Sequence, residues 1–441
     1  MHYKSYSSNN FTKIPQIESL SAGQIREIEI VSSVLPFKTN NYVTEKLINW
    51  ENLPFDPIFV LTFPQKEMLK PRHYELAEKA YHTKDLKEKS AIIKQIRMEL
   101  NPHPAGQTDL NVPKSGEEKL QGTQHKYRQT VLFFPSQGQT CHAYCTFCFR
   151  WPQFTGISEL KFSSNEVDKL VKYLEENPQI TDVLFTGGDP MVMRAHILRK
   201  YIEPLLESNL TSLKNIRIGT KALGYWPQRF YSDSDAPELL KLFKQVKKSG
   251  KHLAIMAHFN HNVELETEEV SQAVKKILKT GAVIRTQSPI MEHINNDSGV
   301  WSKMWSKQVE LGMIPYYMFI ARNTGAQHYF SVPLSIAFQK YREAYQSVSG
   351  ICRTVRGPSM SCLPGKVQVL GINEIAGEKV FTLRFIQGRN PDWIGKPFFA
   401  KFDPKAIWYT DLVPAFGEEK FFFTDELNKM LAGGDEEDDF E

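Results

Sequence analysis

The strongest constraint on the fold is a repeated alternation of short apolar runs and amphipathic helical segments that begins near residue 130. The runs are rich in β-branched and aromatic residues, as buried strands are. Strands joined by helices pair in parallel through right-handed crossovers, so the pattern predicts an α/β fold, either an open doubly wound sheet or a partial barrel. In both arrangements, ligands bind at the carboxyl ends of the strands. The expected strands are TVLFF (130–134), DVLFT (182–186), IRIG (216–219), LAIMAH (253–258), AVIRTQ (282–287) and PYYMFI (315–320).

The segments on either side of this core have different patterns. Residues 1–125 contain helical patches separated by Pro-rich connections, which predicts a helical N-terminal domain. The strand-helix units occupy 126–345, and a smaller C-terminal segment with β-leaning runs covers 346–425. Residues 426–441 are so acidic that we expect a disordered tail.

Composition narrows the classes of function. The sequence has no run of about 20 apolar residues and begins with a polar segment, so we expect a cytoplasmic protein without a membrane partner. The formal net charge is +4, and the basic residues are scattered without interleaved aromatic residues, which argues against a nucleic-acid partner. Lys and Arg side chains gathered in a cleft would still attract small anions.

Three of the five cysteines form a compact group, with Cys141, Cys145 and Cys148 directly after the first predicted strand. A zinc site or incidental core thiols are the plain alternatives, but structural zinc needs a fourth ligand. Three thiolates on a 4Fe-4S cluster leave one iron open to bind S-adenosyl-L-methionine, which an electron from the cluster can cleave to a radical. The spacing of the three cysteines resembles the signature of the radical S-adenosylmethionine (radical SAM) superfamily.

A paired glycine ends the second predicted strand, in the segment Phe185-Thr-Gly-Gly-Asp-Pro190. A Gly-Gly turn alone is only a turn, but paired glycines also let a ligand approach the backbone. After a cysteine triplet, we interpret Gly187, Gly188 and Asp189 as part of the S-adenosylmethionine site.

Further segments are similar to the lysine 2,3-aminomutase family, over roughly residues 35–370. The matching stretches are Arg217-Ile-Gly-Thr-Lys, Pro227-Gln-Arg229, His258-Phe-Asn-His261, Thr286-Gln-Ser288 and Pro315-Tyr-Tyr317. The resemblance implies a partial (β/α)6 barrel and an isomerase that moves an amino group from C2 to C3 of an amino acid. It also implies pyridoxal 5'-phosphate (PLP) as a further cofactor, bound by a lysine that the amino-acid substrate displaces.

The resemblance assigns roles to residues at matching positions. Lys366 is the candidate PLP lysine, although Ser359–Leu363 stand where the family has glycines. Gln287 and His258 are carried over as catalytic residues, and Arg150 as a cofactor-binding residue. A reducing electron donor such as flavodoxin or ferredoxin is implied as a partner, and association into a homo-oligomer stays open.

Two positions indicate the substrate. Arg322 and Arg356 stand where the lysine enzymes have aspartates for the substrate ammonium, and guanidinium groups favour a carboxylate instead. We therefore expect an acidic amino acid such as glutamate rather than lysine. Two alternatives stay open, namely a radical SAM enzyme that acts on a protein lysine or another substrate without PLP-dependent amino migration, and a non-catalytic iron-sulfur or zinc-binding protein.

Overall fold

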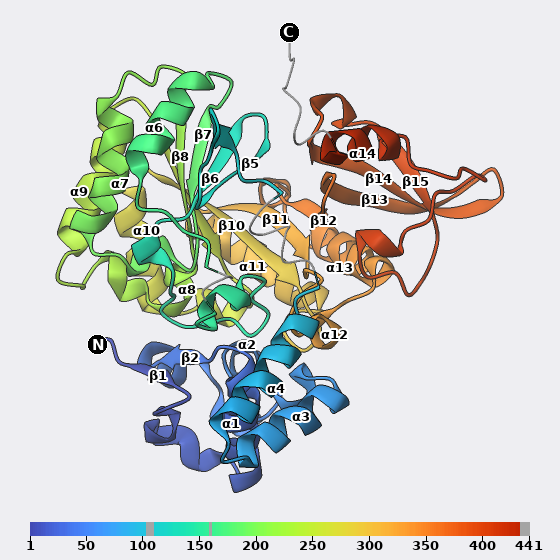
Figure 1. The fold of residues 1–441 in the computed structure, drawn as a ribbon. Coiled ribbons are helices and arrows are strands. Elements are labelled where there is room, and N and C mark those ends of the chain that lie inside the picture. The colour runs from blue at the N-terminus through green and yellow to red at the C-terminus, as the bar shows by residue number, and fades with distance from the viewer. Residues whose placement is uncertain (103–109, 158–160, 433–441) are drawn as a thin grey trace.

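The computed structural model describes residues 1–102, 110–157 and 161–432, and its largest sheet has eleven strands in the order β15-β14-β13-β12-β11-β10-β9-β8-β7-β6-β5 (Figure 1). The six predicted strands lie at its centre and pair in parallel. The α/β class is therefore confirmed. The six strands are β6 (Thr130–Phe133), β7 (Asp182–Phe185), β8 (Asn215–Thr220), β9 (His252–His258), β10 (Val283–Ile290) and β11 (Ile314–Ile320).

A seventh parallel strand, β12 (Arg356–Ser361), pairs with β11 and was not predicted. Its sequence, RGPSMS, has no apolar run and contains a proline, so no strand pattern marks it. The chain then turns back through antiparallel strands, and β5 pairs with β6 in the antiparallel sense at the other edge. These strands are β13 (Gly365–Ile375), β14 (Glu378–Gly388), β15 (Pro397–Lys401) and β5 (Thr123–Tyr127).

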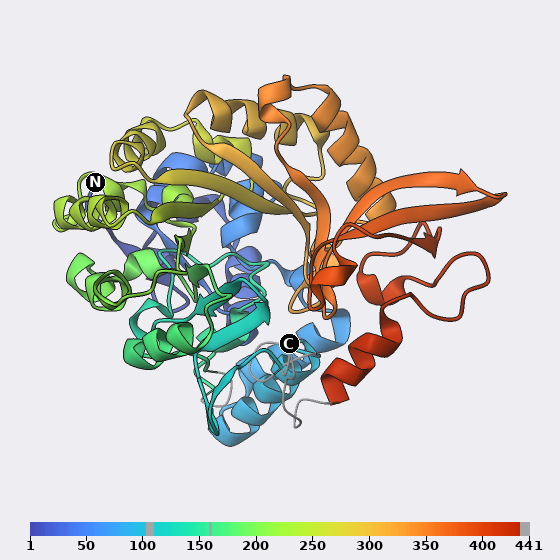
Figure 2. The same cartoon turned by 90° about the horizontal axis from the view of Figure 1, so that it is seen from above.

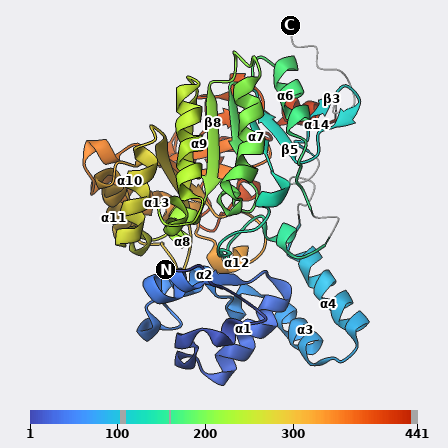
Figure 3. The ribbon, with the colours of Figure 1, turned by 90° about the vertical axis from the view of Figure 1, so that its left-hand side faces the viewer.

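Because β5 and β15 lie at opposite ends of the strand order, the sheet is open, and its parallel part follows an arc when seen from above (Figure 2). Helices cover one face of this arc (Figure 3). On that face the strands carry fully buried apolar side chains such as Val131, Val183 and Ile216. The opposite face carries polar residues, among them Arg217 and Gln287, as the two-residue period of a strand requires. The covering helices are α6 (Val167–Glu176), α7 (Ala195–Glu207), α9 (Ala236–Lys248), α10 (Glu268–Leu278), α11 (Ser298–Glu310) and α13 (Leu334–Gln346).

The N-terminal residues form a mainly helical unit below the sheet in Figure 1. A short antiparallel pair of strands, β1 (Ser5–Ser7) and β2 (Lys38–Asn40), accompanies the helices. The core of this unit includes Ala143 and Trp151 from the loop after β6, so the helical unit packs directly on the cysteine-bearing loop. Its helices are α1 (Ala22–Val34), α2 (Pro57–Thr62), α3 (Pro71–His82) and α4 (Leu86–Glu99).

The remaining elements are short. A hairpin of two-residue strands, β3 (Lys114–Ser115) and β4 (Glu118–Lys119), precedes the sheet. The short helices α8 (Ala222–Tyr225) and α12 (Gln327–Phe330) lie in loops. Helix α14 (Thr424–Ala432) contradicts the prediction of disorder for 426–432, because Leu427 is buried and anchors it; residues 433–441 of the predicted tail lie outside the described residues. In the described ranges, every helix is too short or too polar to cross a bilayer.

Candidate active site

The three clustered cysteines lie in the loop that follows β6, at the carboxyl edge of the parallel strands. The N-terminal unit holds this loop through its backbone. Tyr144 N donates to Lys38 O at 2.7 Å, and the Thr146 hydroxyl donates to Val60 O at 2.8 Å. Between the two anchored residues stands Cys145, so the helical unit fixes the position of its sulfur.

The three thiols form no disulfide and are partly buried. Burial raises the pKa of Cys145 to about 12 and that of Cys148 to about 11, since a lone thiolate is poorly solvated there. A metal cluster that withdraws charge from the sulfurs removes this penalty, so the donor set suits iron-sulfur ligation. Within the described ranges, no three His, Cys, Asp or Glu side chains are close enough to share a single metal ion.

The paired glycines after β7 lie against the loop that leads to Cys141. A Cβ on Gly188 would approach Thr140 O to 2.5 Å, and Gly187 has a φ of +143°, which an L side chain rarely adopts. The structure thus gives the pair a role that the sequence did not reveal, because the glycines let the end of β7 approach the cysteine loop. That contact leaves open their expected role toward S-adenosylmethionine.

Asp189 is buried in the turn after the glycines, and its carboxylate accepts hydrogen bonds from the Thr220 hydroxyl at 2.7 Å and from Lys221 N at 2.8 Å. Burial raises its pKa to about 6 against the lowering effect of these donors. The side chain therefore ties the end of β7 to the end of β8, beneath the predicted ligand site.

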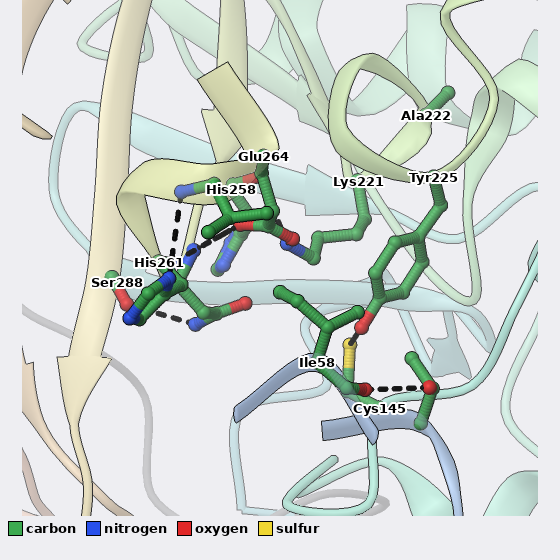
Figure 4. A network of polar contacts seen from close by, with 12 residues as sticks. Ile58, Cys145, Lys221, Ala222, Tyr225, His258, His261, Glu264 and Ser288 are labelled. Atoms are coloured by element: carbon green, nitrogen blue, oxygen red, sulfur yellow. Dashed lines mark hydrogen bonds and ion pairs between the residues drawn. The ribbon is translucent and has the colours of Figure 1, made fainter. Parts of the chain in front are cut away.

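A polar network extends from Cys145 toward β9 (Figure 4). The Tyr225 hydroxyl lies 3.3 Å from the Cys145 sulfur, and its ring lies 4.5 Å from Lys221 Nζ. Lys221 forms an ion pair with Glu264, whose side chain is fully buried and also accepts from Asn260 N at 2.5 Å. No motif in the sequence marks Tyr225 or Glu264.

His258 and Gln287 face each other in register on β9 and β10, with their side-chain nitrogens Nε2 2.6 Å apart. Burial lowers the pKa of His258 to about 3, so the imidazole stays neutral at physiological pH.

Arg150 follows Cys148 by two residues and is buried, with its guanidinium 4.0 Å from the Phe134 ring. Its Nε and Nη2 have no hydrogen-bond partner among the described residues, which suits an anionic ligand.

Lys366 is the second residue of β13 and pairs with Ser361, the last residue of β12. Since β12 is parallel to β11, this position is at the same carboxyl edge as the cysteine loop. Its Nζ lies 4.1 Å from the centre of the Tyr317 ring. Burial, and then the charges of Arg217, Lys126, Arg356 and Arg322, lower the pKa of Lys366 to about 7.

Arg322 follows β11 and lies between the cysteine loop and Lys366. Its guanidinium packs 4.5 Å from the Phe149 ring, next to Cys148, and its charge also lowers the pKa of both Arg150 and Lys366. Arg356 is exposed at the start of β12 and packs on Tyr316 at 4.7 Å. The two predicted substrate residues thus both act on Lys366, Arg322 from inside the site and Arg356 from its rim.

Lys126 in β5 belongs to the same group of cations around Lys366, and no sequence motif marks it. It donates to Cys362 O, and its pKa falls to about 7 through burial and the neighbouring Arg389 and Arg322. A lysine ahead of the first predicted strand carried no signal, because only the antiparallel β5 brings it to the hairpin that bears Lys366.

Known proteins that are similar to this chain are named 2,3-aminomutases. No family model matches the chain. It is 31% identical over 405 residues to "Putative L-lysine 2,3-aminomutase" of Aquifex aeolicus (strain VF5), covering 92% of this chain and 95% of that protein. It is 27% identical to L-lysine 2,3-aminomutase of Clostridium subterminale over 58% of each chain.

A relative with another named substrate is also similar. Glutamate 2,3-aminomutase of Clostridioides difficile (strain 630) is 28% identical over 209 residues, which are 47% of this chain and 46% of that protein. The chain therefore spans nearly all of one relative and about half of the length of others. Among solved structures, the radical S-adenosylmethionine methyltransferase TsrM of Kitasatospora setae aligns with a TM-score of 0.33 and 15% identity, over 54% of this chain and 46% of its own.

Proposed function

This chain belongs to the lysine 2,3-aminomutase family of radical SAM isomerases, and on that premise we propose that it moves an amino group between C2 and C3 of an acidic amino acid. Cys141, Cys145 and Cys148 would hold the 4Fe-4S cluster, and Lys366 would hold pyridoxal 5'-phosphate. When bound, the cluster with S-adenosyl-L-methionine supplies a radical that abstracts hydrogen, and the pyridoxal group carries the migrating nitrogen.

The position of Arg322 carries this proposal. A radical isomerase of this kind needs the source of the radical and the amino group in one cavity, and Arg322 acts on residues of both regions, namely Arg150 beside Cys148 and Lys366 on β13. The neutral His258 and its partner Gln287 lie on the polar face of the sheet, where they can hold a ligand by hydrogen bonds without adding charge.

Lys366 is suited to reversible covalent chemistry. With a pKa near 7, a large fraction of its amine is neutral at physiological pH and able to attack a carbonyl carbon. The cations around it, Arg217, Lys126, Arg356 and Arg322, offer charge for the phosphate of the cofactor.

The same cations support an anionic substrate. Arg322, partly buried beside Phe149, would repel the distal ammonium of lysine and could accept a side-chain carboxylate in a bidentate contact. The similarity to a protein named glutamate 2,3-aminomutase supports glutamate as the first candidate.

The test is turnover by anaerobically reconstituted enzyme with S-adenosylmethionine, pyridoxal phosphate and a chemical reductant, supplied in parallel with L-glutamate or L-lysine. We expect the 3-amino isomer of glutamate, detected by ¹³C NMR, and none from lysine. Arg322→Gln should lower kcat/KM for glutamate by about 10- to 100-fold, the cost of one charged hydrogen-bond pair. Turnover of lysine alone would overturn the substrate assignment.

A further inference from the structure

Tyr225 places a buried hydroxyl beside a cysteine sulfur. The residue ends α8, is 1% exposed, and has its hydroxyl 3.3 Å from the sulfur of Cys145 (Figure 4). Among the described residues, the sulfur is the sole hydrogen-bond partner of this hydroxyl. A hydroxyl that is buried with one partner has little freedom to turn elsewhere.

The tyrosine is fixed from three sides. Its carbonyl oxygen accepts from Asn40 Nδ2 at 3.0 Å, and its amide donates to Lys221 O at 3.0 Å. Its ring lies 4.5 Å from Lys221 Nζ, and the Lys221–Glu264 ion pair holds that ammonium in place. Gly224 leaves the room for this pair, because a Cβ there would lie 3.1 Å from Glu264 Oε1.

The direction of the hydrogen bond follows from the chemistry of a ligated sulfur. A thiolate bound to iron has no proton to give, so the Tyr225 hydroxyl must donate and Cys145 must accept. A donor at a cluster sulfur stabilises the reduced cluster more than the oxidised one, because the reduced cluster carries one more negative charge. Of the other ligands, Cys148 has the backbone amide of Arg150 as a donor, which no side-chain substitution removes.

We propose that Tyr225 is a positioning residue that donates a hydrogen bond to Cys145 and raises the reduction potential of the cluster. The inference rests on the proposed function, since it requires that the cysteines hold a cluster. It assigns a role to a residue outside the motifs that identify the family, and it makes electron delivery to the cluster depend on the end of α8.

The experiment compares reconstituted wild type with Tyr225→Phe, which removes only the hydroxyl. Iron and sulfide content should stay at the wild-type level, while an EPR-monitored redox titration should give a midpoint about 59 mV more negative, a tenfold weaker reduction equilibrium. Tyr201→Phe is the matched control, because Tyr201 is also buried but donates to Gln137, and its midpoint should not move.

Two outcomes would overturn the inference separately from the proposed function. Equal midpoints in wild type and Tyr225→Phe, with full clusters in both, would refute the role of Tyr225 and leave the enzyme assignment intact. A wild type that assembles no cluster would refute both. If Tyr225→Phe assembles poorly, Tyr225→Leu provides a second removal of the hydroxyl, and an unshifted midpoint in that variant counts equally against the proposal.

Discussion

The two ends of the proposed active site differ in how they balance charge. At the cysteine end, Lys221 pairs with the fully buried Glu264, and Arg229 lies 2.9 Å from Asp235. At the lysine end, Lys126, Arg322 and Lys366 have no carboxylate within ion-pair distance among the described residues. Each end has one exception, since Arg217 near Lys366 pairs with Asp182 at 2.7 Å and the buried Arg150 beside Cys148 has no partner at Nε and Nη2 among the described residues. Because burying unpaired charge is costly, the comparison indicates that anionic ligands complete the lysine end and, next to the metal cluster, the position of Arg150.

The two ends also differ in architecture. The cysteine end is formed by loops after parallel strands and is held by the N-terminal unit, as the contact between Thr146 and Val60 shows. The lysine end is an antiparallel hairpin in which Cys362 N donates to Gly365 O at 2.9 Å. Loss of a ligand at one end should therefore leave the fold of the other end intact.

The largest expected effect is a complete and separable loss of each cofactor. Cys148→Ala should abolish assembly of the four-iron cluster, because three sulfur ligands are the minimum for this site, and should still bind pyridoxal phosphate. Borohydride reduces the bond between a lysine and pyridoxal phosphate and so leaves the pyridoxal group on the protein as a permanent label. Lys366→Ala should keep its iron and lose this label. Iron analysis and peptide mass spectrometry measure the two losses independently.

In the wild-type protein, we expect the pyridoxal label on the peptide that contains Lys366. A label on Lys126 instead, with none on Lys366, would assign the covalent role to the neighbouring strand. Loss of both cofactors in either variant would contradict the independence of the two ends.

A smaller effect, on stability, follows from the difference in pairing. Lys221→Met leaves the buried Glu264 carboxylate without its partner and should lower the free energy of unfolding by about 3–5 kcal/mol. Lys126→Met is the matched substitution at the lysine end, where it removes a cation among cations and loses one hydrogen bond to Cys362 O. Its free energy of unfolding should change by no more than about 1 kcal/mol.

Urea denaturation of the cofactor-free proteins measures both values on the same scale. Equal losses in the two variants would show that Lys126 also has a buried anionic partner. The distinction between a paired and an unpaired end would then fail.

Much of the fold was predictable because its central strands have continuous apolar sequences. In β6, Val131 and Phe133 are buried on the helix-covered face, and in β9 Ile255 and Ala257 are. A helix follows each of these runs, so parallel pairing follows from connection rules. Strand β12 was not predictable, because the sequence RGPSMS has no strand pattern of its own. It is a strand because it pairs with β11.

The candidate site was predictable only where residues close together in the sequence form a motif with a known chemical role. The cysteine triplet is local in sequence, whereas Lys126 and Tyr225 reach the site through contacts 236 and 80 residues away, with Cys362 and Cys145 respectively. The paired glycines show the limit of motif reasoning, since Gly188 is required by the approach of Thr140, a contact that its own neighbours in sequence do not indicate. Whether they also hold a ligand stays a prediction.

The smallest expected effect is a pH shift that probes the cations around Lys366 directly. Only the neutral amine of Lys366 can capture the aldehyde of pyridoxal phosphate, and burial with four cations lowers its pKa from 10.5 to about 7. The fraction trapped by borohydride should therefore be half-maximal near pH 7, fall below it and stay level above about pH 8. In Arg356→Gln the midpoint should rise, but by less than one pH unit, because burial is the larger cause and Arg356 is exposed. A wild-type midpoint above pH 9 would mean that other groups already neutralise these cations, and the lysine end would then have no need of an anionic substrate.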